Sequence, residues 1–325
     1  MNKIENTFNF KYRNHKERRV TSMKTSAVKK VKKQYEYVGL LFIAPWIIGF
    51  LVFQLYPLVA SFVYSFTDYN MLNTPSFVGF KNYIEVLTVD PNFWQSIKVT
   101  LIYVVVSVPF KLAVALFIAI ILNVKIRFVG FFRTLYYLPS IMGGSVAIAV
   151  LWRFLFMKDG FINKLLAAVH LQGADWLGDT RFSLFTISLL TVWQFGSSMV
   201  LFLAGLKQIP EELYEAGRMD GASRVRMFFT ITIPMLTPIV LFNIVIQMIN
   251  AFQDFTAAFV ITNGGPANST YLYGIMLYQN AFQYFKMGYA SALSWVLFLI
   301  IIGITALIFK SSSSWAHYED GGGII

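Results

Sequence analysis

The fold of this protein is decided by a polar stretch that runs directly into an apolar one. Residues 207–260 read KQIPEELYEAGRMDGASRVRMFFTITIPMLTPIVLFNIVIQMINAFQDFTAAFV. The second half is mostly apolar over more than 20 residues, the length of helix that crosses a bilayer. The first half, Glu211–Pro234, is rich in charges and small residues, and a chain this apolar does not need so long a connection. We therefore predict a membrane protein with a segment outside the bilayer that contacts another molecule.

The rest of the chain repeats the apolar pattern. Of its 325 residues, 57% are hydrophobic and 13% are charged, against about 25% charged in soluble proteins. Backbone groups in lipid must bond within the protein, so continuously apolar blocks predict helices. We expect an all-α membrane protein with six transmembrane helices. The expected spans are Val38–Tyr64, Lys98–Leu122, Thr134–Phe156, Phe182–Leu206, Met235–Val260 and Gly288–Phe309.

Prolines and one short segment refine this prediction. Pro45, Pro57 and Pro109 lie inside apolar blocks, where the missing N–H is expected to kink or break the helix. Pro234 stands where the fifth span is expected to begin. Phe161–His170 is too short to span, and we expect it to form a helix at the outer surface.

The distribution of basic residues predicts the orientation. Lysines and arginines gather in short loops on the side that also holds both termini, which the positive-inside rule places in the cytoplasm. The expected organisation is a basic cytoplasmic tail (1–37), a six-helix transmembrane domain (38–309) and a short cytoplasmic tail (310–325). The net charge of +11 comes largely from the first tail. A tail that faces anionic lipid explains this charge better than binding to nucleic acid does.

Several kinds of chemistry lack the residues that they need. The chain has no cysteine, and His15, His170 and His317 are far apart, so no pair has metal-ligand spacing. No phosphate-binding GxxxxGK[ST] motif occurs. We expect no metal, no cofactor and no catalytic group in this chain, which argues against an enzyme.

The polar segment has the signals of a short helix. Pro210 fits its first position, and Glu211 and Glu212 follow in the first turn, where the helix dipole favours anions. Gly221 is expected to end the helix.

A stripe of small side chains follows on this helix. Leu213, Ala216 and Gly217 recur at helical spacing and would let another backbone come close. Ser223 is expected to cap a second short helix, after which Pro234 starts the next span. The product is a helix–turn–helix along the membrane. The alternative is an ordinary solvated loop.

Residues 207–234 resemble the EAA loop found in the membrane permeases of binding-protein-dependent ABC importers. That pattern is Glu-Ala-Ala, three residues, Gly, nine residues, Ile, one residue and Leu-Pro. This sequence has Gly217 in place of the second Ala and Ile233 in place of Leu. The matching residues are Glu215, Ala216, Gly221, Ile231 and Pro234.

The resemblance extends over nearly the whole chain after residue 35 and is strongest to the carbohydrate-uptake permeases, the group that includes maltose and glycerol-3-phosphate importers. It rests on Ala44-Pro45-Trp46, Ser65-Phe66-Thr67-Asp68-Tyr69, Phe80-Lys81-Asn82-Tyr83, Phe132-Arg133-Thr134-Leu135-Tyr136-Tyr137-Leu138-Pro139, Thr262-Asn263-Gly264-Gly265-Pro266 and Gly288-Tyr289-Ala290-Ser291-Ala292.

This resemblance implies a type I ABC importer permease fold in a bacterial plasma membrane. It also implies a second related permease, two ATPase subunits that bind ATP and Mg²⁺, and an extracytoplasmic sugar-binding protein. Segment 207–234 would be the coupling helix that docks on the ATPase. The implied coupling residues are Glu211, Glu212, Glu215, Ala216, Gly217, Asp220 and Gly221.

Polar residues inside the fifth apolar block predict a transport path. Asn243, Gln247, Asn250 and Asp254 follow the spacing i, i+4, i+7 and i+11, which places them on one face of one helix. Amides and a carboxylate suit sugar hydroxyls, and aromatic rings suit the C–H face of a sugar. The alternative is that these amides join neighbouring helices. Further candidates for the path are Gln253, Tyr278 and Trp295.

Lys111 lies near the middle of the second span, where a charge is costly. It contacts either an anionic substrate or, as we favour, a carboxylate or a carbonyl freed by Pro109. For the whole chain, the alternatives to an importer permease are a self-contained secondary transporter or channel and, less favoured, a membrane-embedded enzyme.

Overall fold

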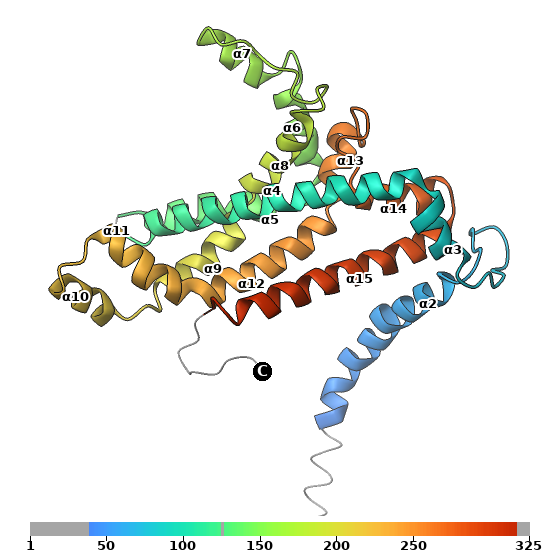
Figure 1. Cartoon of the computed structure of the whole chain (residues 1–325), viewed down its shortest axis with the longest axis horizontal. Coiled ribbons are helices and arrows are strands. Elements are labelled where there is room, and N and C mark those ends of the chain that lie inside the picture. The colour runs from blue at the N-terminus through green and yellow to red at the C-terminus, as the bar shows by residue number, and fades with distance from the viewer. Residues whose placement is uncertain (1–38, 125–126, 317–325) are drawn as a thin grey trace, which may run out of the picture. The chain divides into compact units, whose positions relative to one another are not determined.

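The computed structural model describes residues 39–124 and 127–316 and contains two compact units, Met1–Val63 and Tyr64–Ile325 (Figure 1). Over the described residues the regular structure is helical, with one isolated bridge between Thr67 and Phe77. The helices are α2 (Tyr56–Tyr64), α3 (Lys81–Ile84), α4 (Pro91–Leu122), α5 (Val129–Ile141), α6 (Val146–Phe156), α7 (Phe161–Ala168), α8 (Ser183–Trp193), α9 (Gly196–Leu206), α10 (Glu211–Met219), α11 (Arg224–Met227), α12 (Ile233–Phe252), α13 (Thr256–Thr262), α14 (Tyr273–Tyr278) and α15 (Met287–Ser312), with π-helical turns at Leu51–Leu55, Glu85–Val89, Phe228–Thr232 and Gln279–Gln283.

The membrane-spanning elements agree with the predicted all-α fold. Within the described residues, four helices are long and apolar enough to cross a bilayer, namely Gly39–Tyr64, Pro91–Leu122, Arg224–Phe252 and Met287–Ser312. Two further pairs of helices, each bent at a short break, bring the number to six if each pair makes one span. The predicted tail 1–37 lies outside the described residues, as does most of the predicted tail 310–325, whose first residues continue the helix α15 to Ser312.

The third and fourth blocks, each expected as one span, are each divided into two helices with a bend between them. In the third block, the axis turns by 98° after Ile141, and in the fourth it turns by 48° between Trp193 and Gly196. The first break contains Gly144 in the left-handed region at φ +71°, a conformation that glycine adopts at no steric cost. These breaks place irregular backbone inside the membrane domain, where protein must surround it.

The fifth block also differs from its prediction. One continuous helix runs from Arg224 to Phe252, so Pro234 does not start the span, and the short helix after Ser223 is not separate. In the π-helical turn before Ile233, the Ile233 N–H donates a hydrogen bond to the Phe228 carbonyl. This wider turn moves carbonyls away from the place where the proline ring would clash. The block ends at Phe252, and α13 follows as a second helix.

Prolines inside the other spans do not break them. Gly39–Tyr64 and α4 each stay helical through their prolines, so of the expected kink or break, the break does not occur at Pro45, Pro57 or Pro109. A π-helical turn at Leu51–Leu55 lies just before Pro57.

The second span begins at Pro91, before the expected Lys98. The Asp90 carboxylate accepts the Asn92 N–H at 2.9 Å, and a proline occupies the first helical position. This cap begins the helix about two turns before the expected residue.

The long helix α4 is the centre of the second unit. It packs against α8, α9, α12 and α14, and α12 also packs against α15, so these helices run side by side (Figure 1). Close approach depends on small residues, as is common between membrane helices. A Cβ at Gly205 on α9 would collide with Ile239 Cδ1 on α12. The expected surface helix at Phe161–His170 is present as α7, which packs against α6.

Candidate functional site

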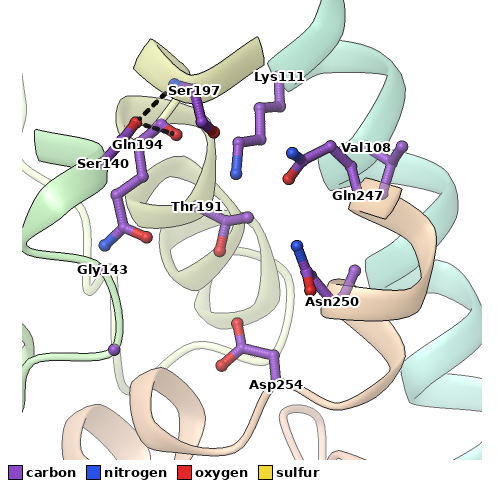
Figure 2. Close-up of a pocket in the computed structure, with 12 residues that line it drawn as sticks. Val108, Lys111, Ser140, Gly143, Thr191, Gln194, Ser197, Gln247, Asn250 and Asp254 are labelled. Carbon is purple, nitrogen blue, oxygen red and sulfur yellow. Dashed lines mark hydrogen bonds between the residues drawn. The ribbon is translucent and has the colours of Figure 1, made fainter. Parts of the chain in front are cut away.

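A polar cavity of about 360 Å³ lies among the helices of the second unit. It is bounded by α4, by the end of α12, and by the two breaks that bend the third and fourth blocks (Figure 2). Its lining residues are Val108, Lys111, Ser140, Gly143, Gly144, Thr191, Gln194, Ser197, Gln247, Asn250, Ala251 and Asp254. Amides, hydroxyls and two opposite charges therefore face a space inside a membrane domain.

Hydrogen bonds hold the two breaks against each other. The Ser140 hydroxyl donates to the Gln194 carbonyl at 3.0 Å and accepts the Ser197 N–H at 3.0 Å. These bonds satisfy a carbonyl at the end of α8 and an N–H in the first turn of α9, both of which lack helical partners. A Cβ at Gly196 would lie 2.6 Å from the Tyr136 carbonyl oxygen. Glycine at this position lets α5 touch the break directly, which fixes one wall of the cavity.

Asp254 lies at the opposite end of the cavity, two residues beyond the end of α12. Its carboxylate accepts a hydrogen bond from the Tyr103 hydroxyl on α4, and that hydroxyl is also bonded to Thr191 on α8 at 2.6 Å. A Cβ at Gly274 would lie 2.8 Å from the Asp254 carbonyl oxygen, so α14 also passes close by. Tyr103 therefore holds the carboxylate directly, Thr191 holds Tyr103, and α14 packs against the Asp254 backbone.

Lys111 projects from α4 into the cavity (Figure 2). Its side chain is only 8% exposed, which confirms that it faces the helix bundle. The prediction that Lys111 contacts a carboxylate or a freed carbonyl is wrong. Within residues 39–124 and 127–316, no hydrogen bond or ion pair joins Lys111 to either group. The expectation failed because the helix stays continuous at Pro109, and Asp254 acts on the ammonium only across the cavity.

The predicted path residues divide into two groups. Gln247, Asn250 and Asp254 line the cavity, although Asp254 does so from beyond the helix and not from one continuous helical face. Asn243 is fully buried outside the cavity lining, and its Nδ2 donates to the Ile239 carbonyl one turn earlier in the same helix at 3.0 Å, so this bond joins it to no neighbouring helix.

The other path candidates also lie outside the cavity lining. Gln253 is exposed at the end of α12. Tyr278 contacts the rings of Phe255, Phe259 and Phe282, so its faces are already packed. The ring of Trp295 makes an edge contact with Phe298.

Sequence reasoning missed most of the opposite wall, which comprises Ser140, Thr191, Gln194 and Ser197. Two signals could have found it. Gly143-Gly144 interrupts the third apolar block, and the polar and small run Gln194–Ser198 interrupts the fourth. Such interruptions mark discontinuous membrane helices that surround a binding site.

The polar segment after α9 forms the predicted helix, α10, which begins at Glu211 with Pro210 as its N-cap instead of its first residue. It ends as expected. Gly221 has φ +70°, the Gly221 N–H bonds the Arg218 carbonyl, and the Ala222 N–H bonds the Gly217 carbonyl. This pair of bonds is the Schellman ending.

The two faces of α10 have different surroundings. Tyr214 bonds Thr232 at 2.8 Å between their hydroxyl oxygens, and a Cβ at Gly217 would lie 3.2 Å from Met227 Sδ. Gly217 therefore packs on the helix that leads into the fifth span of this chain. The other implied coupling residues are exposed, namely Glu211, Glu212, Glu215, Ala216, Asp220 and Gly221.

Comparison with known proteins identifies the family. Residues 92–314 match the family described as binding-protein-dependent transport system inner membrane component. The chain belongs to this family. The permease is 51% identical over 284 residues to the probable ABC transporter permease protein YesP of Bacillus subtilis, covering 86% of this chain and 92% of that one. It is 35% identical over 298 residues to the lactose transport system permease protein LacF of Rhizobium radiobacter, covering 89% and 99%.

Solved structures agree on the fold. A chain of a bacterial alginate ABC transporter, crystallised with a periplasmic protein bound to an alginate pentasaccharide, superposes with a TM-score of 0.72 at 21% identity, covering 87% of the permease and 96% of that chain. The permease is thus an inner-membrane component of an ABC importer, and the family match does not favour a self-contained secondary transporter or channel.

Proposed function

We propose that this permease forms the translocation path of an ATP-driven sugar importer. Its partners are a second related permease, two ATPase subunits that bind ATP and Mg²⁺, and an extracytoplasmic sugar-binding protein, and the chain itself performs no catalysis. Family membership and relatives named for lactose and for arabinooligosaccharide transport support this function. The observation that carries it is the polar cavity, because a path for a polar solute is what such a cavity inside apolar helices can provide.

The cavity has the chemistry that a sugar requires. Gln194, Gln247 and Asn250 each offer an amide that can both donate to and accept from a hydroxyl, and Asp254 accepts hydroxyl protons. Its volume lies within the range of about 300–1,000 Å³ that is usual for small-molecule sites. The lining comes from several helices, so a relative motion of these helices at the two breaks would open the site to one side or the other.

Coupling to ATP hydrolysis would run through α10. Its outer, acidic face is exposed, and its inner face packs on Met227 and Thr232. Both residues belong to the continuous helix Arg224–Phe252, whose 29 residues span about 43 Å at 1.5 Å per residue. A displacement of α10 by an ATPase would therefore move a rigid element that ends beside Asn250 and Asp254. This arrangement requires α10 and both termini to be cytoplasmic, as the basic loops favour.

The coupling role predicts that Glu215→Lys blocks ATP-dependent uptake and reduces recovery of the ATPase during purification of the complex, while membrane insertion is normal. Glu215 makes no hydrogen bond or ion pair among the described residues, so reversal of its charge disturbs an exposed surface only. The control is Asp159→Lys, an equal charge change at an exposed position between α6 and α7. Normal uptake in Glu215→Lys would contradict the coupling role.

The path role predicts that Asp254→Ala abolishes sugar uptake in proteoliposomes while the complex still assembles, because Asp254 faces the cavity. If the assembly fails instead, the carboxylate serves mainly to join helices through Tyr103. Uptake by the permease alone, without any ATPase, would contradict the whole function and favour a secondary transporter.

A further inference from the structure

The cavity contains a positive charge that neither the fold nor a neutral sugar requires. The Lys111 side chain is 8% exposed, lies in the middle of a 32-residue apolar helix and points into the cavity. A charge at such a depth is costly unless a partner compensates it. Within the described part of the chain, no hydrogen bond or ion pair compensates this ammonium. Lys111 is thus a buried donor aimed at a space that holds the transported solute under the proposed function.

Asp254 is the carboxylate that shares this cavity, and the structure assigns it to a different contact. It bonds Tyr103, and it stands across the cavity from the lysine in Figure 2. The cavity therefore has a positive end at α4 and a negative end at the break between α12 and α13. Amides of Gln247 and Asn250 lie along its side.

The geometry points to an acidic saccharide as the transported solute, with its carboxylate bound to the Lys111 ammonium and its hydroxyls bonded to Asp254 and the amides. This inference rests on the proposed function. A lysine ammonium offers three donors as a compact charge, and its hydrogen bond to a carboxylate is about twice as strong as one between neutral groups. The same contact removes the cost of leaving the lysine unpaired.

The negative charge of Asp254, at the end of the cavity away from Lys111, sets the orientation in which an acidic sugar binds. Asp254 repels a carboxylate and attracts hydroxyl donors, so an acidic sugar is held with its charged group at α4 and its neutral ring beside the break. A neutral sugar satisfies the amides and Asp254 equally well but leaves Lys111 uncompensated. The preference for acid over neutral sugar should therefore depend on Lys111 alone.

The test uses matched pairs of ligands on the purified complex of both permeases and the ATPase. The probes are galacturonate, glucuronate and mannuronate disaccharides and their carboxyl-reduced counterparts, in which each –COO⁻ becomes –CH₂OH. Isothermal titration calorimetry without the binding protein reports the site in the membrane domain. We expect at least one acidic disaccharide to bind at least about tenfold more tightly than its reduced counterpart.

Two variants then locate the preference. Lys111→Met should remove it and leave the affinity for the reduced sugar within about threefold of wild type. Lys98→Met, on the same helix but exposed, is the matched control and should keep the preference. A preference that persists in Lys111→Met overturns the inference, as does tighter binding of reduced sugars, or binding of neither set, by the wild-type complex.

A double variant separates ligand binding from internal neutralisation. If Lys111 only balances Asp254, then adding Asp254→Asn to Lys111→Met restores the preference for acidic sugars, which would overturn the inference. If Lys111 binds the ligand, the preference stays lost. The proposed function is tested separately: uptake of a neutral sugar with no acidic preference contradicts only the inference, whereas absence of ATP-dependent uptake of any saccharide contradicts the function itself.

Discussion

Replacing Gly196 by alanine tests whether α5 packs directly against the break between α8 and α9. In Gly196→Ala, the added Cβ would lie 2.6 Å from the Tyr136 carbonyl oxygen and 2.7 Å from Tyr137 Cα, both backbone atoms that cannot rotate away. An ordinary non-bonded contact is about 3.5 Å, so α5 and the start of α9 must separate by about 0.9 Å.

That separation has a calculable cost. The two hydrogen bonds of the Ser140 hydroxyl, each 3.0 Å long, would stretch to about 3.9 Å, beyond useful length. Two lost bonds cost about 1–3 kcal/mol together, and the overpacking costs about 1–3 kcal/mol. We expect a destabilisation of about 2–6 kcal/mol and reduced uptake, because Gln194 moves with the wall.

Thermal denaturation of the detergent-purified complex, followed by size-exclusion fluorescence, measures the first effect, and proteoliposome uptake measures the second. Gly303→Ala is the matched control, since a Cβ there meets nothing within 4 Å, and we expect it to match wild type or to be slightly more stable. If the Gly196→Ala complex has the melting temperature of wild type and transports normally, α5 does not contact the break between α8 and α9.

Further predictions concern single contacts. Tyr103→Phe leaves Asp254 without its hydroxyl donor, at a cost of about 1–3 kcal/mol, and we expect lower uptake with normal complex yield; unchanged uptake would remove Tyr103 from the site. Gly217→Ala meets only flexible side-chain ends and should be tolerated in uptake assays, whereas Gly217→Leu should separate α10 from Met227 and impair coupling. Ser223→Ala removes the cap on the Arg226 N–H, at about 1 kcal/mol, and should speed amide exchange there without preventing assembly.

The local signals in the polar segment were predictable from sequence because they depend on neighbours in the chain. Gly221 ends α10 through its positive φ, and Ser223 caps the next helix, as expected. What followed Ser223 was not predictable in the same way. Pro234 signals a helix start in isolation, yet a π-helical turn at Phe228–Thr232 precedes it and the helix runs on without a break.

Half of the cavity could also be expected from sequence. Gln247, Asn250 and Asp254 were found because polar groups in an apolar block must face something polar. Their common helix was a wrong inference, since α12 ends before Asp254. Ser140, Gln194 and Lys111 reach the same space from other helices, and no spacing along the chain relates them.

The sequence by itself determined the all-helical membrane fold and the family. The length of each apolar block and the spacing of the residues in the 207–234 motif are properties of the linear chain. Only the tertiary structure decided that two apolar blocks bend, which residues the bends bring to one cavity, and that Lys111 faces that cavity without a direct partner. The physical reason is that a bend in a membrane helix is stable only where other helices satisfy the exposed backbone, and those helices are distant in sequence.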